Sequence, residues 1–150
     1  EGSEGRIFVL FMNGYYRDPE TQLVSTQIMA VTLSNSTVVV VFKPVITGGG
    51  GLHSELSLRW TEQSTLVHEL GHVIGLVDSG VPRTPAAQQA GYSVAASTDA
   101  AASGHCANPD CVMYWAHEGL SSLMNMTTRA RTTGSNVLFG QECLEDLAKF

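Results

Sequence analysis

Two histidines and a glutamate lie close together in the segment His68-Glu69-Leu70-Gly71-His72. If this segment is helical, His68 and His72 lie one turn apart on the same face, so both imidazoles can bind one cation. Zinc held by three protein ligands keeps a fourth position open and lowers the pKa of its bound water to about 7. Glu69 lies beside the histidines and can accept a proton from that water. The segment therefore predicts metal-assisted hydrolysis of a carbonyl compound.

The surroundings of this segment favour the functional interpretation over a chance match, which would occur in roughly one chain in fifty of this length if all residues were equally used. Thr61 is the expected N-cap of the helix, and Gly75 is its expected stop. Apolar residues recur between them at helical spacing and predict one buried face: Leu66, Val67, Leu70, Val73 and Ile74.

A third zinc ligand is required, and two residues compete for the role. Asp78 follows His68 by ten positions and offers a carboxylate, which zinc accepts. In Asp78-Ser79-Gly80 the same residue equally fits a turn. His105 offers an imidazole, but residues 79–104 must fold back to bring it to the helix. That segment is rich in Ala, Ser, Gly and Pro and predicts a long surface excursion.

The longer pattern His68-Glu69-x-x-His72-x-x-Gly75-x-x-Asp78 resembles the signature of the metzincin peptidases, in which a glycine turn delivers a third ligand. Metzincins usually have His at the last position, and the snapalysin family has Asp. Farther along, His105-Cys106-x4-Cys111-x-Met113 resembles archaemetzincins, in which a zinc-binding His precedes two cysteines and the methionine of the Met-turn. The resemblance is close over roughly residues 61–115. It implies that Met113 packs beneath a zinc ion.

Two departures separate this chain from archaemetzincins. The 26 residues 79–104 precede His105, which in that family follows the glycine turn directly. Gly140 also stands where the first cysteine of a closing Cys-x-x-Cys pair would be, so that only Cys143 remains. The resemblance further implies that the chain begins after the opening strand and the backing helix of a metzincin domain.

The three cysteines allow two arrangements. Cys106 and Cys111 form a disulfide that closes a small loop, which is the favoured prediction, or they join Cys143 and a fourth ligand in a second, structural zinc site. A disulfide is typical of a secreted or cell-envelope protein, and this location is slightly favoured over the cytoplasm. With the disulfide formed, Cys143 is expected to be a buried helix residue.

Tyr114 follows Met113 immediately. In some metzincins, a tyrosine shortly after the Met-turn contacts the metal or the transition state. Here the tyrosine comes one place early, so a packing role is favoured. Contact with the transition state or the substrate is the alternative.

The remaining sequence predicts an α+β fold. Strands are expected within Arg6–Met12, Gln27–Leu33 and Thr37–Ile46, with Asn35 in a hairpin turn between the last two. An amphipathic helix is expected within Asn136–Phe150, with Phe139, Cys143, Leu144 and Leu147 on its apolar stripe. The resemblance implies a metzincin-like catalytic domain with a small mixed sheet, an active-site helix, a Met-turn and a C-terminal helix. An edge strand within Thr37–Ile46 would then hold an extended peptide.

Composition limits the classes of partner. The 150 residues, 43% of them hydrophobic, suit one domain spanning residues 1–150. The net charge of -6, with only 8 basic residues, excludes a partner recognised through its phosphates, such as a nucleic acid. No apolar run reaches the roughly 18 residues of a membrane span, so membrane insertion is not expected. The expected partner is a peptide or protein substrate, and the oligomeric state stays open.

The predicted function is that of a zinc-dependent peptidase, most simply an endopeptidase, which hydrolyses peptide bonds by a zinc-bound water that Glu69 activates. One alternative is a catalytically weak zinc-binding module that recognises a peptide or protein without cutting it. The other is a purely structural domain in which the motif is accidental.

Overall fold

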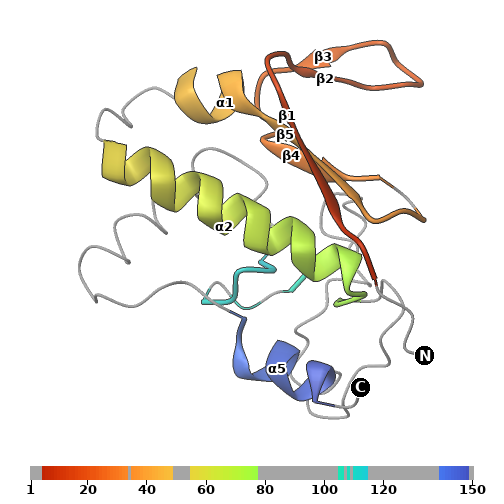
Figure 1. The fold of residues 1–150 in the computed structure, drawn as a ribbon, viewed down its shortest axis with the longest axis vertical. Coiled ribbons are helices and arrows are strands. Elements are labelled where there is room, and N and C mark those ends of the chain that lie inside the picture. Colours follow the sequence, from red (N-terminus) through yellow and green to blue (C-terminus); the bar gives the residue numbers. More distant parts are fainter. Residues whose placement is uncertain are drawn as a thin grey trace.

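A computed structural model describes residues 5–33, 35–48, 55–77, 105–106, 108, 110–114 and 139–148 of the chain. Within these residues, strands precede helices: β1 (Phe8–Met12), β2 (Tyr16–Arg17), β3 (Val24–Ser25), β4 (Ala30–Thr32), β5 (Val38–Phe42), α1 (Lys43–Gly48), α2 (Glu55–Val73) and α5 (Gln141–Leu147). The long helix α2 lies between the sheet and α5 (Figure 1). None of the described helices is long and apolar enough to cross a membrane.

The main sheet has three strands in the order β1-β5-β4. β1 pairs with β5 in parallel, and β4 pairs with β5 antiparallel. β2 and β3 form a separate two-stranded ribbon. This small mixed sheet with few helices confirms the α+β class predicted from the sequence.

The predicted strand Thr37–Ile46 is wrong in its second half and in its place in the sheet. The strand ends at Phe42, and α1 begins at Lys43 with Pro44 in its first turn. Proline is well suited to that position, because the first turn of a helix has no partner for its N–H groups. β5 lies between β1 and β4, so β4, within the predicted strand Gln27–Leu33, is the edge strand on that side.

A tight turn joins β4 to β5 at the place predicted for a hairpin. Asn35 has a φ of 56°, in the left-handed region that asparagine tolerates better than most residues. The amide of Leu33 donates to the carbonyl of Val38 at 3.0 Å. The hydroxyl of Ser36 donates to the carbonyl of Leu33 at 2.9 Å and accepts from the amide of Val38 at 3.1 Å. These bonds fix the end of β4 next to α2.

Helix α2 begins earlier than predicted. Its first residue is Glu55, so Thr61 is not an N-cap but a buried residue inside the helix. The predicted stop is confirmed, because Gly75 has a φ of 86° and its amide bonds to the carbonyl of His72 at 3.0 Å. Glycine adopts this left-handed conformation without steric cost.

Two core clusters lie on opposite sides of α2. The first joins the sheet and α1: Met29, Ala30, Val39, Val41, Phe42, Val45 and Ile46. The second joins the end of α2 to the segments around residues 106–113 and 143: Leu76, Val77, Cys106, Cys111, Val112, Met113 and Cys143. Helix α5 is shorter than the predicted Asn136–Phe150, and Leu144, expected on its apolar stripe, is 46% exposed.

Candidate metal centre

Three imidazoles converge beside the C-terminal half of α2. His68 and His72 come from the helix. His105 immediately precedes Cys106, which belongs to the second core cluster. The ring centroids of His68 and His72 are 4.9 Å apart, and each lies 5.2 Å or 4.9 Å from that of His105. Each ring offers a nitrogen within 4.8 Å of the others. The structure thus brings together three of the four residues predicted as metal ligands.

The orientation of His68 fits a metal ligand. Its Nδ1 lies 2.7 Å from the carbonyl oxygen of Val112, which can only accept, so Nδ1 carries the proton and donates. The lone pair on Nε2 is therefore available, and this atom lies 3.2 Å from Nε2 of His72. Two nitrogens bound at about 2.0–2.1 Å to one tetrahedral zinc lie roughly 3.3 Å apart. A carbonyl holding the second nitrogen is the usual way in which a ligating histidine is oriented.

His72 is suited to remain neutral near pH 7. Burial lowers its pKa from 6.5 to about 4, and electrostatic repulsion from the neighbouring His105 adds to this effect. A neutral imidazole keeps the lone pair that a metal needs. The site therefore presents metal-binding nitrogens without first having to lose a proton from this ring.

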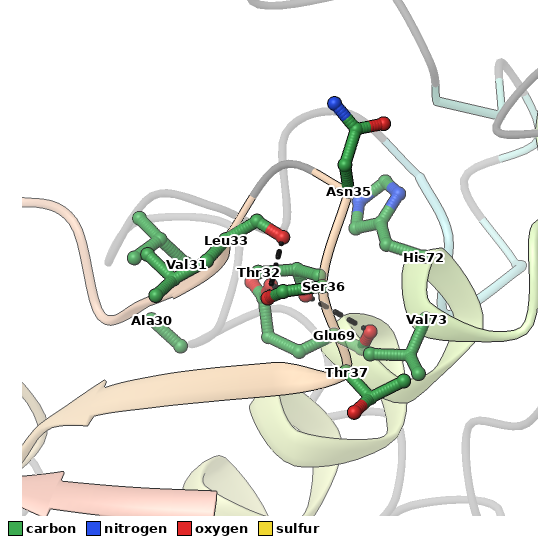
Figure 2. Close-up of a pocket in the computed structure, with 10 residues that line it drawn as sticks. All are labelled: Ala30, Val31, Thr32, Leu33, Asn35, Ser36, Thr37, Glu69, His72 and Val73. Atoms are coloured by element: carbon green, nitrogen blue, oxygen red, sulfur yellow. Dashed lines mark hydrogen bonds between the residues drawn. The ribbon is translucent and has the colours of Figure 1, made fainter. Parts of the chain in front are cut away.

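Glu69 faces the same region from the next position of α2. Its side chain is buried, and its Oε2 accepts a hydrogen bond of 2.6 Å from the hydroxyl of Thr32 on β4. Figure 2 shows this bond, with Glu69 and His72 on the same side of the helix. Together with Val73 of α2, both line a cavity of about 620 Å³. Its other walls are β4 and the turn that follows it: Ala30, Val31, Thr32, Leu33, Asn35, Ser36 and Thr37.

Met113 packs directly against the part of α2 that contains His68 and His72. Its side chain is fully buried, and a Cβ added to Gly71 would lie 2.2 Å from its Sδ. Gly71 is the residue between the two helical histidines that permits this approach. The sequence resemblance predicted Met113 at this place, but it assigned no role to Gly71. The signal was the smallest residue in the middle of a helix, where glycine is otherwise unfavourable.

The structure does not contain the predicted disulfide between Cys106 and Cys111: all three cysteines are in the thiol form. Their sulfurs, together with that of Cys143, lie within 4.8 Å of one another, and Sγ of Cys111 lies 3.5 Å from Sγ of Cys143. A covalent S–S bond is about 2.05 Å long, so Cys111 and Cys143 are not bridged either, and the three thiols form one cluster. Such a cluster is a donor set that zinc and other thiophilic ions accept.

The polar contacts of the cluster favour a thiolate at its centre. The thiols of Cys106 and Cys143 donate toward Cys111, and this is the main reason that the pKa of Cys111 is lowered. The amide of Gly140 donates to the same sulfur at 3.2 Å, and that of Met113 does so at 3.4 Å. Gly140 therefore contacts the cluster through its backbone amide.

The roles predicted for Asp78 and Tyr114 remain predictions. Asp78, the alternative third ligand, lies outside the described residues. Tyr114 is half-buried, its amide donates to the carbonyl of Cys111 at 3.0 Å, and it forms a backbone bridge with Cys106. Its contact with a substrate or transition state stays a prediction.

Comparisons of the chain with models of protein families, with curated proteins and with solved structures found no match. The geometry of the two clusters and of Glu69 is therefore the basis for the function.

Proposed function

We propose that the chain is a zinc-dependent peptidase of the metzincin type, in which His68, His72 and His105 hold the metal and Glu69 is the general base. One observation supports this above all others. Three imidazoles have converging nitrogens, and one of them, His72, shares a cavity with the buried carboxylate of Glu69. A purely structural site has little use for an acid–base group beside an open coordination position, whereas hydrolysis requires both.

Zinc, when bound here, would polarise the scissile carbonyl and make water acidic enough to attack it at neutral pH. Glu69 would take the proton from the attacking water, because its carboxylate is the acid–base group that shares the cavity with His72. The same carboxyl group would then donate that proton to the amine that leaves. His68, held by the carbonyl of Val112, would keep its ring orientation throughout.

The edge strand β4 supports a peptide as substrate. The carbonyl of Met29 accepts from Phe42 of β5, and the amide of Leu33 donates to the carbonyl of Val38. Backbone groups alternate in direction along a strand, so those of Ala30 and Thr32 point away from β5. Among the described residues no strand pairs with this outer edge. An extended peptide could pair there and cross the cavity that contains Glu69, which favours cleavage within a chain.

We further propose that the cysteine cluster binds a second ion, zinc or another thiophilic metal, with a structural role. Cys111 and Cys143 join the segment that contains Val112 and Met113 to α5, so an ion there would fix the underside of the metal centre. A secreted or cell-envelope location stays a prediction.

Cleavage of casein by the zinc-loaded protein tests the proposal. Glu69→Gln is expected to retain zinc and to lose activity by about 10²–10⁴-fold, which is the usual contribution of a general base. Glu55→Gln, an exposed carboxylate on the same helix, is the matched control and should cleave normally. Equal cleavage by Glu69→Gln would contradict the assignment. Zinc retained without cleavage by the wild type would favour the alternative, a zinc-binding module that recognises peptides.

A further inference from the structure

We propose that Thr32 is a positioning residue that couples the pairing of a peptide substrate on β4 to the orientation of Glu69. This inference rests on the proposed peptidase function. It concerns a residue far from the histidine motif in sequence, and nothing in the motif predicts it. Thr32 and Glu69 are 37 positions apart in the sequence, and a hydrogen bond of 2.6 Å joins the hydroxyl of Thr32 to the carboxylate of Glu69.

Thr32 helps to determine where the carboxylate of Glu69 points. Glu69 is 4% exposed, and its Oε2 receives the hydroxyl of Thr32. The side chain of threonine is branched at Cβ and has few rotamers, so the position of this hydroxyl follows the strand backbone closely. A shift of β4 is therefore transmitted to the general base.

The hydroxyl of Thr32 has two acceptors within hydrogen-bond distance, both on Glu69. Oγ1 of Thr32 lies 2.6 Å from Oε2 of Glu69 and 3.1 Å from the backbone carbonyl oxygen of Glu69. A hydroxyl has one hydrogen to donate and can also accept. It can donate to the carboxylate, or donate to the carbonyl while it accepts from a carboxylic acid. Thr32 can thus stay bonded to Glu69 before and after the base has taken its proton.

The backbone of Thr32 would contact the substrate. The N–H and C=O of Thr32 point away from β5, toward the outer edge of the sheet. A peptide that pairs with this edge would hold the backbone of Thr32 in place, and the side chain of Thr32 would hold Glu69. Longer peptides that complete this pairing should therefore react faster once bound, in addition to binding more tightly.

The test compares Thr32→Val, which keeps the shape but removes the hydroxyl, with Thr32→Ser, which keeps the hydroxyl. Thr47→Val, at an exposed threonine of α1 that does not line this cavity, is the matched control. We expect kcat to fall about 10–100-fold in Thr32→Val with little change in KM, since that is the usual result of a misplaced catalytic group. Thr32→Ser should recover most of the loss, and Thr47→Val should match the wild type.

A series of peptides of increasing length gives a result that a merely structural role would not produce. In the wild type, residues that extend the pairing along β4 should raise kcat, whereas in Thr32→Val they should lower KM only. If Thr32→Val does not fold, which thermal melting and zinc content would reveal, Thr32→Ala takes its place with the same expectation.

The outcomes separate this inference from the proposed function. If the wild type cleaves and Glu69→Gln does not, but Thr32→Val retains its kcat, only the coupling through Thr32 is refuted. Equal losses in Thr32→Val and Thr32→Ser would also refute it, because the hydroxyl would not be the cause. If the wild type itself fails to cleave any peptide while loaded with zinc, both the function and the coupling are wrong.

Discussion

The contact between Gly71 and Met113 allows a quantitative test of the arrangement beneath the metal centre. A Cβ at position 71 would lie 2.2 Å from Sδ and 3.0 Å from Cε of Met113, and 3.2 Å from Cε1 of Phe139. The first distance is far below contact, so Gly71→Ala requires the methionine to move. Met113 is fully buried, and the cluster around it leaves few positions for its side chain.

The expected change in stability combines two opposed effects. Replacing a mid-helix glycine by alanine stabilises a helix by about 1 kcal/mol. Forcing an extra methyl group into a packed core typically costs about 1–3 kcal/mol. Gly71→Ala should therefore lower the free energy of unfolding by up to about 2 kcal/mol. Because Met113 lies under the histidines, the affinity for zinc should fall as well.

Urea unfolding of a double-mutant cycle isolates the contact. In a Met113→Ala background the sulfur is absent, so Gly71→Ala should become stabilising by up to about 1 kcal/mol. The sign of the effect should thus differ between the two backgrounds. If Gly71→Ala stabilises both proteins equally, Met113 does not pack against α2, and the proposed Met-turn is refuted.

Two further predictions concern protonation and the cysteine cluster. Because the folded state holds the pKa of His72 at about 4 against 6.5 when unfolded, the unfolded state binds more protons between these values. The metal-free protein should therefore lose up to about 3 kcal/mol of stability as the pH falls from 6.5 to 4; urea unfolding across this range checks it, and a slope unchanged in His72→Gln would contradict it. Cobalt loaded into the wild type should show sulfur-to-metal charge-transfer absorption that Cys143→Ser weakens and that Leu144→Ser, an exposed neighbour on α5, leaves intact. The same spectrum in all three proteins would exclude the cluster as a metal site.

Local sequence patterns predicted the parts of the centre that one helix positions. The spacing of His68 and His72 needs only helical periodicity, and the left-handed conformations of Gly75 and Asn35 follow from their residue types. The same local reasoning failed where two structures suit one residue. Pro44 fits an edge strand as well as the first turn of a helix, and Thr61 fits an N-cap as well as a helix interior.

The contacts that complete the centre are not local, and this is why the sequence could not reveal them. The bond between Thr32 and Glu69 depends on how β4 lies against α2. The cysteine cluster depends on Cys143, which is 32 residues from Cys111. The sequence allowed Cys143 to join the other two sulfurs, but the missing fourth cysteine favoured a disulfide, and only the packing of α5 distinguishes the two arrangements.

The zinc content of the purified protein, measured by elemental analysis together with casein cleavage, tests the central claim most directly. His105→Ala should contain one zinc ion per chain fewer than the wild type and should not cleave casein, whereas Asp78→Ala should match the wild type in both. A His105→Ala protein with undiminished zinc and activity would show that His105 is not the third ligand. A wild type that binds no zinc after reconstitution would contradict the whole account of the metal centre.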